Sequence, residues 1–305
     1  MALSFGDTLV ARVAERESQI VLGLDPDPSA LWPESGREPT RGSAAEQAGE
    51  AVLGHCRALI EATATACVAT KLQLACFERL GAPGWSALEA VAEHARAQGL
   101  LVIADGKRGD ISVSAAAYAQ ALIGGMQTPF GAVAGLGADM VTVNPLMGGD
   151  ALEPFVTAAR AAGAGVLALV RTSNPGAADV EDLELAGGGS VWERLAGIVD
   201  ELGAPGVGEM GLSDVGAVVG ATVPAHLVRA RELMPSATLL LPGVGAQGGR
   251  VEDLAPAFAP GRAGGLITAS RSIANAYLAT GESPARAARA EAERLREVAW
   301  ALGGR

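Results

Sequence analysis

The sequence predicts an α/β fold in which eight parallel strands, each followed by a helix, close into a TIM (β/α)8 barrel. Eight short apolar runs alternate with helical patterns along the 305 residues. The runs are continuous rather than alternating, as in parallel strands that are buried on both faces. Eight β/α units in a chain of this length fit one barrel, so we expect residues 1–305 to form a single domain with a C-terminal helix. An open, doubly wound parallel sheet is the alternative fold.

The predicted strands are the apolar runs themselves. In chain order they are IVLGL (20–24), CVATKL (67–72), LLVIA (100–104), MVTVN (140–144), VLALVR (166–171), GAVVGA (216–221), TLLLP (238–242) and GLITAS (265–270). Helix starts between them carry capping signals, in which a serine precedes an acidic residue by three positions. These pairs are Ser43 with Glu46, Ser190 with Glu193 and, more weakly, Ser4 with Asp7. Ser283 and Pro284 open a charged helix that we expect to reach about Leu302.

Two segments interrupt this rhythm. Residues 25–42 contain proline, glycine and charged residues without clear periodicity, and residues 174–189 are acidic and end in three glycines. The β/α alternation resumes directly after each of them. We therefore interpret both as insertions in barrel loops rather than as linkers between domains.

The composition restricts the partners of this chain. A formal net charge of −11 argues against nucleic acid or an anionic membrane surface as the main partner, although a local basic pocket can still bind a small anion. The N-terminal segment lacks the basic start and apolar core of a signal peptide, and no apolar stretch is long enough to cross a bilayer. Three cysteines (Cys56, Cys67 and Cys76) without CxxC spacing predict reduced thiols and a cytoplasmic location rather than a zinc site.

Polar residues follow almost every predicted strand. Because the active sites of such barrels lie at the carboxyl ends of the strands, we expect these residues to share one rim. In strand order they are Asp25, Lys71, then Asp105, Lys107 and Asp110, then Asn144, then Arg171, Thr172 and Ser173, and finally Ser270 and Arg271. Each alone can be a turn or surface residue, and only the shared rim favours function. His55, His94 and His226 fall within helical patterns, so we interpret them as packing or surface residues and predict no metal site.

The run DGKRGDI (105–111) carries the strongest chemical signal. Asp105 and Lys107 are two positions apart, so at the end of a strand both side chains project to one face. Charged groups are rarely buried without partners, and a lysine among carboxylates stays charged and ready to donate a proton. The alternative is a solvated turn with incidental charges.

The glycine-rich run PGVGAQGG (242–249) predicts a phosphate site together with Arg271. Glycines let backbone N–H groups approach an anion closely, and TIM barrels often hold phosphate between the loops after strands seven and eight. Arg271 can bind a phosphate through two parallel hydrogen bonds, and Gln247 adds a neutral donor. The alternative is a flexible glycine turn beside a surface arginine.

These residues together resemble the orotidine 5′-phosphate decarboxylase family. DGKRGDI matches the family's Asp-x-Lys-x-x-Asp signature, which is shared with sugar-phosphate decarboxylases of related fold. GLDP (23–26), SNPGA (173–177) and PGVGAQGG match further family motifs, so the similarity spans nearly the whole chain. The chain is similar to the longer bacterial subfamily. Its 174–189 insertion, and Ser114 where shorter members often have threonine, depart from the family pattern.

The resemblance implies that the chain converts orotidine 5′-phosphate to UMP and carbon dioxide in pyrimidine biosynthesis, without cofactor or metal. Lys107, held charged by Asp105 and Asp110, would stabilise a carbanion at C6 of the pyrimidine and then protonate it. Lys71 would belong to the same charged network. The implied substrate contacts are Asp25 to the ribose, Ser173 to the pyrimidine, and Pro242, Gly245, Gln247, Gly248 and Arg271 to the phosphate.

The resemblance also implies a homodimer. In the family, the second aspartate of the signature reaches the neighbouring subunit's site, so Asp110, with Ile111 and Ser114, would complete a partner's pocket. Two other functions stay open. One is a magnesium-dependent keto-sugar phosphate decarboxylase or aldolase on the same barrel, and the other is a non-catalytic barrel that binds a phosphometabolite.

Overall fold

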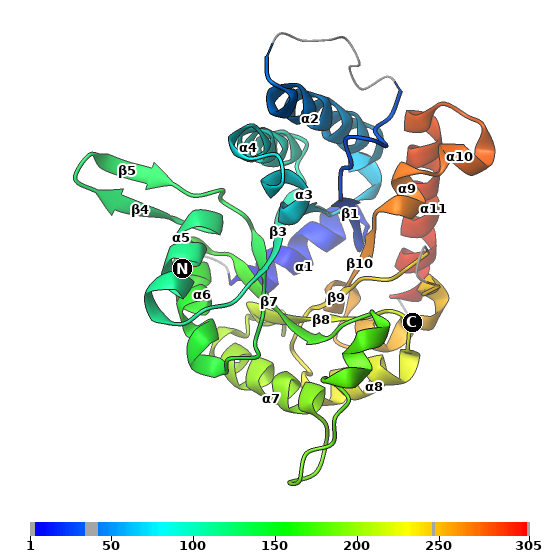
Figure 1. Cartoon of the computed structure of the whole chain (residues 1–305). Helices are drawn as coiled ribbons and strands as arrows, with labels where there is room; N and C mark the ends of the chain where they lie inside the picture. Colours follow the sequence, from blue (N-terminus) through cyan, green and yellow to red (C-terminus); the bar gives the residue numbers. More distant parts are fainter. Residues whose placement is uncertain (1–3, 34–41, 246–247, 304–305) are drawn as a thin grey trace.

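The computed structural model describes residues 4–33, 42–245 and 248–303. Eight parallel strands close into a barrel in the order β1-β10-β9-β8-β7-β6-β3-β2, with helices around it (Figure 1). These strands are β1 (Ile20–Leu24), β2 (Ala69–Gln73), β3 (Leu101–Arg108), β6 (Met140–Val143), β7 (Gly165–Arg171), β8 (Val215–Val219), β9 (Leu239–Leu241) and β10 (Gly265–Ala269). Each apolar run predicted as a strand overlaps one of them. The closed order confirms the barrel and excludes the doubly wound sheet.

Four helices begin directly after the serines that the sequence predicts as helix starts, namely Ser4, Ser43, Ser190 and Ser283. The bounds of the described helices are α1 (Phe5–Arg16), α2 (Ala44–Thr63), α3 (Leu74–Glu78), α4 (Ala82–Ala97), α5 (Ser112–Leu122), α6 (Gly149–Ala162), α7 (Val191–Gly203), α8 (Pro224–Leu233), α9 (Arg271–Ala274), α10 (Tyr277–Thr280) and α11 (Pro284–Leu302). At the start of α2, the N–H of Ser43 donates to Glu46 Oε2 at 2.7 Å and the N–H of Glu46 donates to Ser43 Oγ at 3.3 Å. These reciprocal bonds satisfy two backbone donors that the helix itself cannot pair.

Aliphatic side chains fill the inside of the barrel, and α1 covers one end of it. Buried residues of the strands, among them Ile103 and Leu167, form one cluster with Leu9 and Val13 of α1. Phe5 of α1 packs so closely on Gly165, the first residue of β7, that a Cβ there would lie 2.5 Å from the Phe5 ring. Helix α1 therefore closes the amino-terminal end, which leaves the carboxyl end of the barrel for a pocket.

A two-stranded hairpin that the sequence analysis did not predict projects from the barrel (Figure 1). It consists of β4 (Gly125–Thr128) and β5 (Gly131–Ala134), paired antiparallel after α5. Both strands are largely exposed, and Phe130 at the turn is 99% exposed. Because neither face is buried, the hairpin lacks the apolar pattern from which strands are recognised.

The described residues of both predicted insertions form ordered segments that are bonded to elements around the barrel. In the first, where residues 34–41 lie outside the described residues, Trp32 is buried: its backbone N–H donates to His55 Nδ1 at 3.1 Å and its indole N–H to the Ala274 carbonyl at 2.8 Å. The second contains a short 3-10 helix (Pro175–Asp179) and a bridge between Glu184 and Ser190. None of the described helices is both long and apolar enough to span a membrane.

Candidate active site

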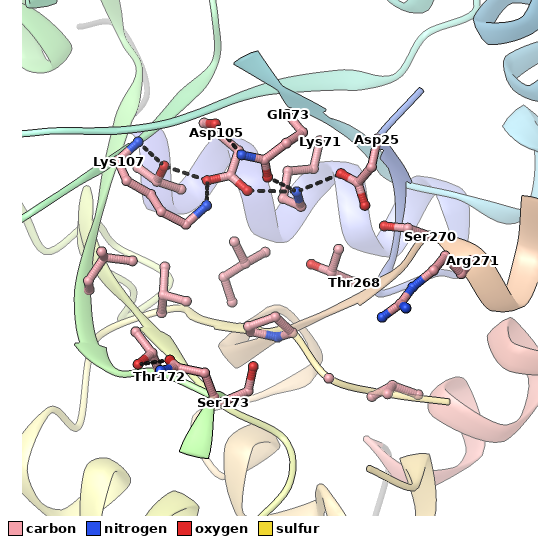
Figure 2. Close-up of a pocket in the computed structure, with 18 residues that line it drawn as sticks. Asp25, Lys71, Gln73, Asp105, Lys107, Thr172, Ser173, Thr268, Ser270 and Arg271 are labelled. Carbon is pink, nitrogen blue, oxygen red and sulfur yellow. Dashed lines mark hydrogen bonds and ion pairs between the residues drawn. The ribbon is translucent and has the colours of Figure 1, made fainter. Parts of the chain in front are cut away.

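A pocket of about 390 Å³ lies at the carboxyl ends of the strands. Each of the eight barrel strands, or the loop that follows it, contributes to its wall. Seven residues that the sequence predicts as site residues line it: Asp25, Lys71, Asp105, Lys107, Ser173, Pro242 and Arg271. Figure 2 shows Lys107, Asp105, Lys71 and Asp25 in a row along one side, with Thr172 and Ser173 opposite and Arg271 near one end.

A network of charges joins β1, β2 and β3 at this wall. Asp105 binds two lysines, with Lys71 Nζ 2.6 Å from its Oδ2 and Lys107 Nζ 2.6 Å from its Oδ1. Lys71 Nζ also lies 3.5 Å from Asp25 Oδ1. The hydroxyl of Thr142, on β6, donates to Asp105 Oδ1 at 2.8 Å. Both oxygens of Asp105 are therefore occupied, and the carboxylate has a fixed orientation.

Burial and ion pairing together determine the pKa values of the groups in this network. The side chains of Lys71 and Asp105 are 8% and 6% exposed, whereas that of Lys107 is 43% exposed. Burial opposes the charged form of Asp105, but the attraction of Lys71 and Lys107 outweighs it and lowers the pKa of Asp105 to about 2. Burial likewise opposes the charge of Lys71, but Asp105 and Asp25 raise its pKa above the usual value. Both groups are therefore ionised at neutral pH.

The lowered pKa of Asp105 predicts an acid-sensitive contribution to stability. An aspartate in an unfolded chain has a pKa near 3.8, whereas that of Asp105 is about 2 in the folded chain. Its contribution is therefore present above pH 3.8 and is lost as the pH falls towards 2. The difference corresponds to roughly 2 kcal/mol of unfolding free energy. Urea unfolding at a series of pH values should show a steeper acid loss for wild type than for Asp105→Asn. Equal slopes would contradict this role of the carboxylate.

The backbone at Lys107 has a left-handed conformation that side-chain-bearing residues seldom adopt. Its φ is +48°, and its N–H donates to Thr142 Oγ1 at 3.0 Å. The pairing of β3 with β6 shifts register between Ala104 and Arg108, so the strand bulges where Lys107 lies. Strained backbone of this kind occurs where the surrounding structure imposes it, often at functional sites. Here the strain accompanies an ammonium held beside Asp105.

Arg271 and the loop after β9 form the end of the pocket that we predicted for phosphate. Arg271 is the first residue of α9 and lines the pocket with Ser270, Pro242 and Gly243. Gly245 and Gly248 have φ values of +76° and +89° and lie in the same loop, just beyond the described lining. Their N–H groups donate within that loop, to Gly249 and Gly245 respectively. Gln247 lies outside the described residues.

Besides Gly245 and Gly248, three predicted site residues do not line the pocket of this chain: Asp110, Ile111 and Ser114. Asp110 accepts a hydrogen bond from the N–H of Ile111 at 2.8 Å, and Ile111 and Ser114 are exposed near the start of α5. The described part of one chain thus offers Lys107 a single carboxylate, that of Asp105. The predicted role of Asp110 across a dimer interface requires a second subunit.

Sequence reasoning missed several pocket residues. Among the polar ones are Gln73, Thr142 and Thr268. Gln73 follows Lys71 by two positions at the end of β2, a spacing that could have placed it on the same face. Thr142 and Thr268 lie inside apolar runs, where threonine is an ordinary strand residue, so no signal marked them. Arg171, which the sequence placed on the rim, is absent from the described lining and binds acidic residues instead.

The histidines and cysteines pack rather than gather at the pocket wall. His55 is buried edge-to-face against Trp32, and burial lowers its pKa to about 4, so it is neutral. Cys56 and Cys67 are buried and Cys76 is half-buried, and all three are free thiols. These placements confirm that His55 and the two buried cysteines are packing residues.

The fold and this pocket define a (β/α)8-barrel enzyme whose site combines a lysine–aspartate–lysine network with an arginine. A model of the orotidine 5′-phosphate decarboxylase / HUMPS family matches residues 18–289. The orotidine 5′-phosphate decarboxylase of Deinococcus radiodurans is 48% identical over 216 residues, covering 70% of this chain and 74% of that protein. That of Roseiflexus castenholzii is 37% identical over 297 residues, or 97% of each chain.

Solved structures agree with these relatives. A Streptomyces avermitilis crystal structure, provisionally described as an orotidine 5′-phosphate decarboxylase, superposes with a TM-score of 0.81 at 31% identity. The match covers 100% of this chain and 98% of that one. The chain belongs to the orotidine 5′-phosphate decarboxylase / HUMPS family.

Proposed function

We propose that this chain decarboxylates orotidine 5′-phosphate to UMP and carbon dioxide in pyrimidine biosynthesis, with Lys107 as the proton donor. One observation carries the proposal: Lys107 Nζ lies 2.6 Å from Asp105 Oδ1 in a pocket that also contains Arg271. A relative that carries this activity in its name is 37% identical across 97% of the chain. The pocket thus contains one cation, Lys107, that can stabilise and protonate a carbanion, and a second cation, Arg271, that can bind the phosphate of the substrate.

The chemistry follows from the position of the ammonium. When the bond between C6 and the departing carboxyl group breaks, its electron pair stays on C6 of the pyrimidine. The Lys107 ammonium stabilises this charge and then transfers a proton to C6, which leaves a neutral amine and UMP. Asp105 holds the ammonium, while Lys71 and Thr142 hold Asp105. Because these bonds exist before the substrate arrives, little reorganisation accompanies the reaction.

The rest of the pocket binds the parts of the substrate that do not react. Arg271 and Pro242 bind the phosphate, Asp25 binds the ribose, and Ser173 contacts the pyrimidine. All of them line the same pocket as Lys107. Binding energy from these remote groups orients C6 at the ammonium and so lowers the barrier to reaction.

The direct test is carbon dioxide release from orotidine 5′-phosphate by the purified protein, measured with and without EDTA. We expect release at the same rate in both conditions, because the protein's own cation stabilises the carbanion. Loss of activity in EDTA would favour the magnesium-dependent keto-sugar reaction. Binding of UMP without any release of carbon dioxide would favour a non-catalytic barrel.

We also propose that the active form is a homodimer in which Asp110 completes the partner's site. Asp110 lies outside the pocket of its own chain, among exposed apolar side chains. Ile111 and Val113 are 53% and 83% exposed, and Met147, close to Gly109, is 48% exposed. Exposed apolar side chains clustered around a charged residue favour an interface between subunits.

Mixing two inactive variants tests this arrangement. Lys107→Ala and Asp110→Ala should each be inactive alone. After co-refolding or subunit exchange, heterodimers should contain one intact site, so a random mixture should recover about a quarter of wild-type activity. Recovery of no activity, or a fully active monomer at high dilution, would contradict the shared site.

We place the enzyme in the cytoplasm on the basis of its thiols. All three cysteines are free, and burial raises the pKa of Cys67 to about 12, so its reactive thiolate is scarce. Free thiols persist in reducing compartments, and cell fractionation tests the location.

A further inference from the structure

The acidic insertion after β7 folds back onto the residue that ends this strand. Arg171 is 11% exposed, and its guanidinium binds Asp182 through two parallel bonds, with Nε 2.7 Å from Oδ1 and Nη2 2.8 Å from Oδ2. Its Nη1 lies 3.7 Å from Glu181 Oε2 and donates to the Thr172 carbonyl at 2.5 Å. A bidentate arginine–carboxylate pair of this kind fixes both partners in direction as well as in distance. The hydrogen bond with Arg171 also lowers the pKa of Asp182, so this carboxylate stays charged.

Glu181 binds Thr172, the residue that follows Arg171 and that belongs to the pocket wall. Its Oε2 accepts the backbone N–H of Thr172 at 2.8 Å, and its Oε1 accepts the Thr172 hydroxyl at 2.9 Å. The same hydroxyl lies 2.7 Å from Asn174 Oδ1. Thr172, Ser173 and Asn174 all line the pocket. Bonds from Glu181 therefore act on a wall segment, residues 172–174, although Glu181 itself is not part of the described lining.

The end of β8 holds this wall segment from the other side. The N–H of Gly220 donates to the Arg171 carbonyl at 2.7 Å. A Cβ at Gly220 would lie 2.8 Å from Ser173 Cα and 2.9 Å from Ser173 Cβ, so this close approach requires glycine. Ser173 is thus confined between β8 and the residues that Glu181 and Asp182 hold.

The insertion is itself attached to a packed helix. The Glu181 carbonyl accepts the N–H of Trp192 at 2.9 Å, and the Leu183 carbonyl accepts the N–H of Val191 at 3.0 Å. Val191 and Trp192 begin α7, and Trp192 is buried. The carboxylates therefore have a rigid support, as groups that position a site require.

We propose that Glu181 and Asp182 are positioning residues that act through Arg171 and Thr172 to fix the wall segment 172–174 opposite Lys107. This inference rests on the proposed function, in which Ser173 contacts the pyrimidine. The insertion then sets the affinity for the base and leaves the phosphate end to Arg271. Asp105 and Lys107 lie on β3, across the pocket from this wall segment. Loss of the bonds from Glu181 and Asp182 therefore raises KM more than it lowers kcat.

The test compares two ligands that share a ribose phosphate but differ in the base. Glu181→Ala should weaken UMP binding about tenfold or more, since it removes two hydrogen bonds to a charged group. Binding of ribose 5-phosphate, which has no base to meet Ser173, should change by less than about twofold. Titration calorimetry measures both, and steady-state kinetics should show the rise in KM.

Two further variants make the result specific. Glu184→Ala removes the same charge from an exposed position of the same insertion and should leave both affinities unchanged. Glu181→Gln keeps an oxygen that can accept the Thr172 N–H, so it should restore most of the UMP affinity. Equal weakening of both ligands, or unchanged UMP binding in Glu181→Ala, would overturn the proposal. A wild-type protein that binds UMP but releases no carbon dioxide would instead count against the proposed function alone.

Discussion

Replacing Lys107 with alanine is expected to lower carbon dioxide release by about four orders of magnitude, because general acid catalysis and charge stabilisation each contribute about a hundredfold or more. The protein should stay folded. Lys107 is partly exposed, and Asp105 keeps its bonds to Lys71 and Thr142 without it. Single-turnover measurements of carbon dioxide release, with circular dichroism to confirm the fold, would test this. A rate within about tenfold of wild type would mean that another group donates the proton.

The Lys107→Arg variant separates proton donation from charge. Arginine keeps a cation near Asp105, but it does not release a proton at neutral pH. We expect this variant to remain almost inactive while it still binds UMP. Near-normal activity would show that the role of Lys107 is purely electrostatic.

Replacing Lys71 with methionine should have the largest effect on stability. Lys71 is 8% exposed and lies between Asp105 and Asp25, so its loss leaves a buried carboxylate short of a counter-charge. Removing one partner of a buried ion pair typically costs about 3–5 kcal/mol. Lys107 still faces Asp105, which favours the lower end of that range. Urea unfolding at about pH 7 measures the change through the midpoint and the slope.

A double variant provides the control for this prediction. In Lys71→Met combined with Asp105→Asn, both charges of the pair are gone, and part of the lost stability should return. The double variant should remain inactive, because Lys107 loses the carboxylate that directs it. If Lys71→Met alone unfolds within about 1 kcal/mol of wild type, the buried pair is not the structural support that its geometry indicates.

The sequence predicted the barrel because its strands are continuous apolar runs. Such runs can be recognised without knowing which strands pair with one another. The exposed hairpin formed by β4 and β5 gave no such signal, because burial creates the pattern and this hairpin has little. Capping pairs such as Ser43 with Glu46 were predictable because they are local in sequence. Long-range features, such as the closing of one barrel end by α1, were not.

The candidate site divides in the same way. Asp105 and Lys107 lie two residues apart on one strand, so their meeting was predictable from the alternation of side chains. The bond between Lys71 and Asp105 depends on the register of β2 against β3, in which Gln73 pairs with Asp105, and no single sequence states that register. The role of Thr142 could not be predicted, because it consists of two hydrogen bonds, to Lys107 and Asp105, between residues that are far apart in the sequence. The proposed role of Asp110 concerns a second chain, so the pattern within one chain does not specify it.

The carboxylate of Asp105 has a consequence for attempts to make this protein more heat-resistant. It joins Lys71 on β2, Lys107 on its own strand and Thr142 on β6, so one group links three neighbouring strands and also orients the ammonium that we propose as the proton donor. Replacing a buried ionic cluster with well-packed hydrophobic side chains often increases the stability of a protein. Here that exchange would remove turnover. If the proposed role of Lys107 holds, thermal stability and catalysis depend on the same side chains, and a stabilising substitution at Asp105 is expected to cost activity.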